Sequence, residues 1–447
     1  MGLELGSLPL LQEAARRLEE GFRDLPDYAV EIDAAALRNV LMDVAERMRD
    51  NYPYHHPMYA GQMLKPPHPV ARLAYMLALW MNPNNHALDG GRASSAMEKD
   101  AVANIARMFG WQEHLGHLCG GGTMANMEAL WVSKRLAPGK KAVASTQAHY
   151  THARLSEVLG LPFEAIPCDA RARMDVNALE DALKRGNIGT VVATIGTTAA
   201  GSVDPLPDIL ALRDKYGFRL HADAAYGGYF ALAENLRPET RAAFDRIADV
   251  DSIVVDPHKH GLQPYGCGCI LFKDPTVGRF YKHDSPYTYF SSAELHLGEI
   301  SLECSRAGAS AVALWATQRL LPMTRGGEFA KGLERGRQAA LAFFEKLAAD
   351  ARFLTGFPPE LDIIIFAPKA DRAQEVSHLS RQLFEAAAQE SLHLAVATFP
   401  AALFRDAWPI QWDAEQVACM RSCLMKADHL AWLDPIWHAL NRAMSRL

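Results

Sequence analysis

One lysine of the chain lies between two histidines. Lys259 belongs to the segment Asp-Pro-His-Lys-His-Gly at residues 256–261, directly after a short apolar run at residues 252–255 that predicts a buried strand. Neighbouring positive charge and removal from water both lower the pKa of an amine, so we expect a nucleophilic amine at this position. The competing interpretation is an ordinary solvated loop lysine.

A carboxylate stands at the end of another predicted strand. Asp223 follows the strand candidate at residues 218–222 and is flanked by small residues in His-Ala-Asp-Ala-Ala-Tyr-Gly-Gly at residues 221–228. Ligands of open α/β sheets bind at the carboxyl ends of the strands, where this carboxylate could meet a planar cationic group. It could equally cap the next turn.

A glycine-rich segment precedes a predicted helix. Residues 119–126 read Cys-Gly-Gly-Gly-Thr-Met-Ala-Asn and run into a helical pattern at residues 127–134. Free backbone N–H groups and the positive end of the helix dipole suit a phosphate, although such glycines often form only a tight turn. The segment is neither a Walker loop nor a dinucleotide fingerprint, because the loop lysine and the glycine spacing are absent.

An imidazole follows a third strand candidate. His149 lies in Gln-Ala-His-Tyr at residues 147–150, after the apolar run at residues 141–144. An imidazole can stack on an aromatic ring or move a proton near neutral pH, whereas a single histidine more often has a structural role. The phosphate segment, His149, Asp223 and Lys259 together predict one site, because the last three each lie near the end of a strand.

The elements that must position these residues alternate along the chain. Strand candidates at residues 141–144, 190–195, 218–222 and 252–255 are mostly continuous apolar runs separated by helical patterns, which indicates a parallel sheet buried on both faces in an α/β domain. Two amphipathic helices are predicted at residues 10–22 and 34–48, a proline-rich extended stretch at 52–69, and a helix at 307–320. After a break at residues 325–327, a strand candidate at 362–366 indicates a smaller α+β domain.

The composition excludes several classes of protein. The formal net charge of −6 and the absence of a basic cluster argue against a nucleic-acid partner. No apolar stretch approaches the ~20 residues that span a bilayer, and the first residues lack a signal-peptide pattern, so we expect a cytoplasmic protein without a membrane partner. The seven cysteines have no zinc-ligand spacing; we expect buried reduced thiols, with Cys419 and Cys423 spaced as on one helical face, and no metal site.

The combination of motifs resembles the fold-type-I pyridoxal-phosphate enzymes, and within them the group II amino-acid decarboxylases. The resemblance covers nearly the whole chain. Its segments are His-Pro at 56–57, Gly-Gly-Thr-Met-Ala-Asn at 121–126, Thr-Ile-Gly-Thr-Thr at 194–198, Gly-Ser-Val-Asp-Pro at 201–205, the segments around Asp223 and Lys259, Leu-Glu-Cys-Ser-Arg at 302–306, and Met-Arg-Ser-Cys-Leu-Met at 420–425.

The resemblance implies a three-layer α/β fold of the PLP-dependent transferase type I. Its central sheet is expected to be mostly parallel, with an N-terminal helical segment and a smaller C-terminal α+β domain. The expected division is an N-terminal helical dimerisation segment at residues 1–60, a large domain that binds pyridoxal 5′-phosphate (PLP) at 61–322, and a small domain at 323–447.

The resemblance also implies a role for each candidate residue. Lys259 is expected to form the internal aldimine, Asp223 to keep the pyridine nitrogen protonated, and His149 to stack on the cofactor ring. The other cofactor contacts implied by the resemblance are Ala225 on the opposite ring face, Gly122, Thr123 and His258 near the phosphate, Thr198 near the ring substituents, and Ser305 from the partner subunit. An active site shared across a homodimer follows from the last assignment.

The expected reaction is decarboxylation of an L-amino acid to its amine and CO2 through a quinonoid intermediate. By the resemblance, a tyrosine on a mobile loop protonates the substrate carbon; Tyr287 and Tyr289 are the candidates, with Tyr281 also considered. The substrate-binding candidates are His56, Tyr59 and Gln62, which could instead support a dimer interface.

The side chain that the enzyme accepts stays open from the sequence, with aromatic substrates slightly favoured. His260 after Lys259 departs from several family members, which carry an aromatic or apolar residue there. The alternative is another PLP reaction, by a carbon–carbon lyase, an oxidative deaminase or an aminotransferase. For an aminotransferase, Arg421 would be the candidate carboxylate ligand, although the decarboxylase pattern accounts for this residue as well.

Covalent labelling tests the central assignment. Borohydride reduction of the protein with its cofactor, followed by peptide mapping, is expected to label Lys259, and Lys259→Ala is expected to remove the visible imine absorption band. The assignment fails if Lys259 stays unlabelled or if the band survives the substitution.

Overall fold

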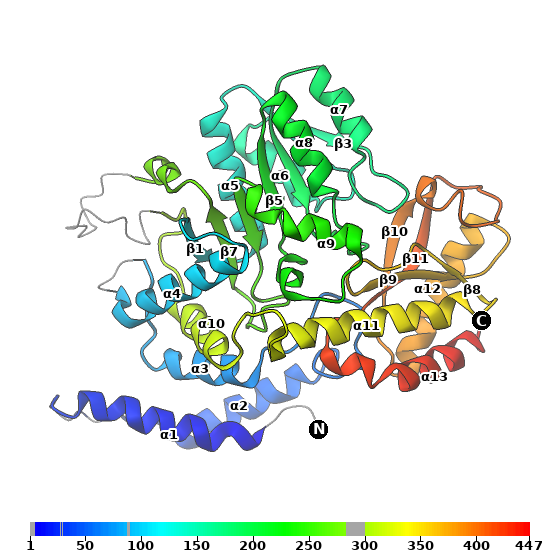
Figure 1. The fold of residues 1–447 in the computed structure, drawn as a ribbon. Coiled ribbons are helices and arrows are strands. Elements are labelled where there is room, and N and C mark those ends of the chain that lie inside the picture. The colour runs from blue at the N-terminus through cyan, green and yellow to red at the C-terminus, as the bar shows by residue number, and fades with distance from the viewer. Residues whose placement is uncertain (1–4, 27, 29, 87–89, 283–299) are drawn as a thin grey trace.

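The computed structural model describes residues 5–26, 28, 30–86, 90–282 and 300–447 (Figure 1). Its helices are α1 (Leu8–Glu19), α2 (Ala34–Met48), α3 (Pro69–Leu79), α4 (Arg92–Met108), α5 (Gly122–Leu136), α6 (Thr151–Leu159), α7 (Val176–Lys184), α8 (Leu206–Tyr216), α9 (Pro238–Asp245), α10 (Gly308–Leu320), α11 (Glu328–Ala348), α12 (Ala373–Gln389) and α13 (Leu433–Met444). Its strands are β1 (Leu115–Cys119), β2 (Lys141–Ser145), β3 (Phe163–Ile166), β4 (Ile188–Thr194), β5 (Arg219–Asp223), β6 (Ser252–Val255), β7 (Gly268–Phe272), β8 (Phe353–Thr355), β9 (Ile363–Pro368), β10 (Ala395–Pro400) and β11 (Gln416–Cys423).

A seven-stranded sheet lies at the centre of the molecule, in the order β1-β7-β6-β5-β4-β2-β3. The strands β3, β2, β4, β5 and β6 pair in parallel, whereas β7 runs antiparallel to both of its neighbours, β6 and β1. The carboxyl ends of the parallel strands therefore meet at one edge of the sheet.

Helices cover both faces of this sheet. Side chains of a strand alternate between the faces, so Ile253 and Val255 of β6 join the core that contains residues of α4, α8 and α9. Val254, between them, packs with Ala125 and Ala129 of α5 on the other face. The predicted three-layer, mostly parallel α/β arrangement is therefore confirmed.

The C-terminal part of the chain forms a second sheet, with four antiparallel strands in the order β10-β11-β9-β8. Helices α11, α12 and α13 pack on one face around Phe343, Phe366 and Leu440. Figure 1 shows this layer beside the central sheet, at the orange and red end of the chain. The boundaries predicted at residues 60 and 322 stay predictions.

Several predicted elements match closely, and six strands were not predicted. The five predicted strands are all present, in the same order: residues 141–144, 190–195, 218–222, 252–255 and 362–366 correspond to β2, β4, β5, β6 and β9. The helices predicted at residues 34–48 and 307–320 correspond to α2 and α10. Helix α5 begins at Gly122, five residues before the predicted start at 127, so the glycine segment forms its first turn. The missed strands are β1, β3, β7, β8, β10 and β11.

The prediction for the cysteines needs two corrections. Cys419 and Cys423 lie on the strand β11 and not on a helix. Residues four apart share one face of a strand as well as of a helix, so their spacing does not distinguish the two. The seven cysteines all lie in the described residues and form no disulfide there, but Cys304 is exposed and Cys168 is only partly buried. Among the helices of the described residues, none has the length and apolar character needed to cross a membrane.

Candidate active site

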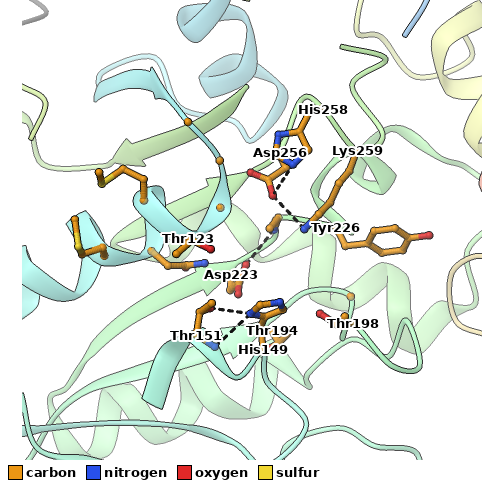
Figure 2. A pocket seen from close by; sticks show the side chains of 18 residues that line it. Thr123, His149, Thr151, Thr194, Thr198, Asp223, Tyr226, Asp256, His258 and Lys259 are labelled. Atoms are coloured by element: carbon orange, nitrogen blue, oxygen red, sulfur yellow. Dashed lines mark hydrogen bonds and ion pairs between the residues drawn. The ribbon is translucent and has the colours of Figure 1, made fainter. Parts of the chain in front are cut away.

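A cavity of about 480 Å³ opens where the parallel strands end and α5 begins. It is bordered by Thr194 at the end of β4, Asp223 at the end of β5, and Lys259 in the turn after β6. Figure 2 shows Asp223 in the middle of the site, with Lys259 and Asp256 on one side and His149 and Thr151 on the other. Residues from four separate segments of the sequence therefore surround one space.

Lys259 forms an ion pair with a carboxylate of its own turn. Its Nζ lies 3.1 Å from Oδ2 of Asp256, a residue that is 2% exposed. The expected positive neighbours are not present, because burial lowers the pKa of His258 and lowers the pKa of His260 well below its usual value. Both histidines are therefore neutral near pH 7. The prediction that they would surround Lys259 with positive charge is wrong; its charged neighbour is a carboxylate.

Asp223 is held by a histidine that the sequence did not single out. Nε2 of His152 lies 2.8 Å from Oδ2 of Asp223, and the other carboxylate oxygen accepts a hydrogen bond from the backbone N–H of Ala225 at 3.2 Å. Burial alone would raise the pKa of Asp223, but the hydrogen bond and charge of His152, together with Lys259, hold that pKa well below its usual range. Asp223 is thus a buried, ionised carboxylate facing the cavity.

The first turn of α5 forms another wall of the cavity. Gly121 has a φ of +152°, and a Cβ built on Gly122 would lie 2.7 Å from Oδ2 of Asp256, so glycine lets the helix approach the strand end closely. The first N–H groups of a helix, here those of Gly122 and Thr123, have no acceptor within the helix. They point, with the helix dipole, toward the place where an anion would bind.

His149 is oriented by the residue that begins α6. Its Nδ1 lies 2.8 Å from Oγ1 of Thr151 and accepts a hydrogen bond from the Thr151 N–H at 3.3 Å. Burial lowers the pKa of His149, so its imidazole is neutral near pH 7. Since Nδ1 is an acceptor, we assign the ring proton to Nε2.

Most of the predicted cofactor contacts line the cavity together. These are Gly122, Thr123, His149, Thr198, Asp223, Ala225, His258 and Lys259. Ser305 does not: it is exposed, and its hydroxyl accepts a hydrogen bond from Asn84 at 3.2 Å. Tyr287 and Tyr289 lie outside the described residues. Tyr281 is buried away from the cavity and donates a hydrogen bond to Glu128 at 2.9 Å.

The three predicted substrate-binding residues do not line this cavity. His56 lines a second cavity, and Tyr59 is buried in a cluster of aromatic rings with Tyr52 and Tyr54. Gln62 is exposed and accepts a hydrogen bond from Arg421 at 3.2 Å.

Arg421 is buried, and its guanidinium is engaged by the protein itself. Besides Gln62, it donates to the carbonyl oxygen of Thr198 at 2.7 Å and to that of Gly61 at 3.3 Å. Arg421 is not one of the described residues that line the cavity. Arg421 therefore positions Thr198 rather than presenting a free guanidinium to a ligand.

The sequence prediction missed His152, Asp256, Thr151 and Tyr226. Asp256 begins the Asp-Pro-His-Lys segment, three residues before Lys259, and that spacing could have suggested the ion pair between the two residues. His152 and Thr151 follow His149 closely, but no periodicity indicates that His152 reaches a residue 71 positions away.

The residues present fit PLP. Asp223 matches a cationic ring nitrogen, Lys259 an aldehyde, and the first turn of α5 a phosphate. Three buried polar atoms at the site have no hydrogen-bond partner among the described residues: Oδ1 of Asp256, Nδ1 of His258 and Oγ1 of Thr194. A polar molecule in the cavity would supply the partners that buried groups require.

Comparisons with known structures give the same fold. The crystal structure of mouse CSAD matches with a TM-score of 0.79 at 19% identity, over 96% of this chain and 91% of that one. The crystal structure of Oryza sativa TDC with PLP and tryptamine matches with a TM-score of 0.79 at 16% identity, over 100% and 99%. At these identities the likeness establishes the fold.

Sequence relatives are amino-acid decarboxylases. An L-tyrosine decarboxylase of Enterococcus faecium is 29% identical over 411 residues, with 69% of this chain and 67% of the relative covered. An L-aspartate decarboxylase of Thermococcus kodakarensis is 30% identical over 285 residues, with 63% and 72% covered. The chain thus spans about two thirds of the length of the tyrosine decarboxylases that it matches. For the tyrosine decarboxylase of Levilactobacillus brevis, the match covers 63% of that protein's length.

The family comparison agrees with the site. A model described as the pyridoxal-dependent decarboxylase conserved domain matches residues 127–369, which is more than half of the chain. The match contains His149, Asp223 and Lys259, the residues around which the cavity is built. The protein therefore belongs to the family of pyridoxal-dependent decarboxylases, which are carboxy-lyases that use PLP.

Proposed function

We propose that the protein decarboxylates an aromatic L-amino acid, with L-tyrosine as the leading candidate, to the corresponding amine and CO2. The observation that carries the proposal is the arrangement of Lys259, Asp223 and the first turn of α5 around one cavity at the ends of the parallel strands. An amine, an ionised carboxylate and an anion site at that spacing meet the needs of PLP together.

The preference for an aromatic side chain rests on the cavity lining. Among the described residues that line the cavity there is no arginine, which is the side chain that best pairs with a carboxylate. An acidic substrate would bring a second carboxylate close to Asp223 and Asp256. Relatives include both tyrosine and aspartate decarboxylases, so L-aspartate is the comparison substrate.

When bound, PLP supplies an electron sink for the bond that breaks at the substrate carbon. Asp223 would hold the ring nitrogen of the cofactor, and its carboxylate would favour a proton there. His152 and the N–H of Ala225 fix the two oxygens of that carboxylate. Because Asp223 is ionised at all physiological pH values, this stabilisation is present throughout the working range.

The remaining residues orient groups and hold protons. Oδ2 of Asp256, at 3.1 Å from Nζ, orients the side chain of Lys259. The neutral ring of His149, fixed by Thr151, offers a flat face for stacking and a proton on Nε2. Thr198 is fixed through its carbonyl by Arg421.

Several assignments complete the proposal. Tyr287 or Tyr289 protonates the substrate carbon, and Ser305 contributes a phosphate contact to the partner subunit. His56, Tyr59 and Gln62 do not line the cavity of Lys259, so we assign them no substrate contact there. The seven unpaired cysteines suit a reducing compartment, so we place the protein in the cytoplasm.

We also propose a homodimer that buries the N-terminal helices. On α2 the side chains of Leu37, Leu41, Val44 and Met48 are 50–62% exposed and recur every three or four residues, which places them on one stripe of the helix. A continuous exposed apolar stripe of this kind is typical of an interface. Figure 1 shows α1 and α2 along the lower edge of the molecule, beside α3.

The activity can be tested directly with a panel of L-amino acids. We expect the holoenzyme to release CO2 and tyramine from L-tyrosine with a kcat/KM at least tenfold above that for L-aspartate. Release of keto acid, aldehyde or peroxide is measured in the same samples to detect other PLP reactions. Absence of CO2 from every amino acid contradicts the proposal, and faster turnover of L-aspartate contradicts the substrate class.

Removal of His152 tests how Asp223 is held. A hydrogen bond to a charged group contributes about 1.5–3 kcal/mol, so His152→Ala is expected to weaken PLP binding by roughly ten- to a hundredfold. Absorbance titration of the apoprotein with PLP measures the effect. His152→Asn, which keeps a donor, should restore part of the affinity, and His378→Ala, at an exposed histidine on α12, should change nothing. Unaltered PLP binding by His152→Ala would show that Asp223 needs no such support.

Charge placed on the apolar stripe of α2 tests the dimer. The double variant Leu41→Glu, Val44→Glu is expected to be a monomer by size-exclusion chromatography with light scattering, whereas the wild type has twice that mass. Asn39→Glu adds a charge on the opposite side of the same helix and should stay dimeric. A monomeric wild type, or a double variant of unchanged mass, rules out this interface.

A further inference from the structure

A second cavity, of about 550 Å³, lies behind the turn that carries Lys259. It is enclosed by residues 55–57 and 65–69, by α3 and α11, and by a short 3₁₀ helix, Ala427–Leu430. The two cavities share no lining residue among those described, because Lys259 faces the first and His260 faces the second. A volume of this size suits a small organic molecule.

Two lysines bring positive charge to this cavity. Lys426 is 6% exposed and donates to the carbonyl oxygen of Tyr59 at 2.5 Å, and Lys65 donates to that of Met425 at 3.3 Å. Within the described part of the chain, neither ammonium has a carboxylate within ion-pair distance, 4.0 Å. Burial, and then the charge of Lys65, lowers the pKa of Lys426 to about 7. Burial lowers the pKa of Lys65 to about 8, against the opposing effect of the Asp362 charge.

The acidic groups nearby are already engaged or face solvent. Asp362 accepts a hydrogen bond from Tyr226 at 2.6 Å and lies 3.3 Å from Nε2 of His260. Glu328 pairs with Arg335 at 2.9 Å, and Asp428 is exposed. The charge of Asp362 acts on Lys65 and that of Asp428 on Lys426, without contact at ion-pair distance. The cationic side chains that line the cavity still outnumber the lining carboxylates: they are Lys65, Arg72, Arg335 and Lys426, against Glu328 and Asp428.

His260 adds an unsatisfied donor or acceptor to the same cavity. Its side chain is 1% exposed, and Nδ1 has no hydrogen-bond partner among the described residues. Nearly all buried polar atoms in proteins have a partner, so an atom of this kind at a cavity wall points to a polar group that is bound there.

Part of the remaining wall is apolar. Pro66, Pro67, Phe329, Leu333 and Trp432 contribute apolar surface to the lining. A ligand that carries a negative charge and an apolar or aromatic body would match both kinds of lining residue.

We propose that this cavity binds a small organic carboxylate, whose charged group lies at Lys65 and Lys426 and whose apolar body lies against Phe329 and Leu333. The site is distinct from the cavity that contains Lys259. The two cavities share no described lining residue, so a ligand can bind here whatever the substrate of the first cavity is.

Isothermal titration of the full-length holoenzyme with phenylacetate tests the proposal. Gly332 lines the cavity from α11, and a Cβ built on it has no atom within 4 Å, so the backbone accepts a side chain there and Gly332→Phe is expected to narrow the cavity. We expect Gly332→Phe and Lys65→Met each to weaken phenylacetate binding at this site at least tenfold. Lys331→Met removes a charge from the exposed side of the same helix and should bind like the wild type.

Two further ligands define the chemistry. Phenylacetamide, the neutral counterpart, should bind at least tenfold more weakly than phenylacetate, and inorganic phosphate should bind more weakly as well. The proposal is overturned if phenylacetate does not bind, if Gly332→Phe leaves its binding unchanged, if phenylacetamide binds equally well, or if phosphate binds more tightly. Phenylacetate that occupies the first cavity is recognised because its binding survives Gly332→Phe.

Discussion

The site depends on one buried carboxylate that must stay ionised. Removing an unpaired carboxylate from water costs several kcal/mol, so Asp223 requires partners before any ligand arrives. His152 and the N–H of Ala225 supply them at 2.8 and 3.2 Å. The position of α6 follows from this requirement, because its first turn must bring His152 to the end of β5. The same turn carries Thr151, which orients His149.

The parallel sheet brings the other groups to the same place. Strands β4, β5 and β6 end at one edge, so Thr194, Asp223 and the Asp256–Lys259 turn converge although long stretches of chain separate them. The contact of Gly122 with Asp256 brings the N-terminus of α5 against that edge. An anion site, an ionised carboxylate and an amine are thereby held at the spacing of one cofactor by backbone elements rather than by flexible loops.

The single chain leaves some charges and apolar surfaces without partners. The exposed stripe on α2 and the lysines of the second cavity are two such regions, and they differ in kind. An apolar stripe is satisfied by another apolar surface, which a second copy of the chain provides. Buried ammonium groups need a negative charge, which no described carboxylate provides at contact distance.

Local patterns alone were enough to predict β2, β4, β5, β6 and β9, because strands buried on both faces read as continuous apolar runs. They were also enough to identify the segments of Lys259, Asp223, His149 and the glycine turn, because residue type and order along the chain carry that information. The strands β1 and β11 escaped prediction since Gly116, His117 and Arg421 interrupt the apolar pattern. Only the tertiary structure decided which partners these residues have. His152 meets Asp223, His260 turns away from Lys259 toward Asp362, and Arg421 supports Thr198, because contacts between distant segments depend on how the layers pack and leave no periodic signal in the sequence.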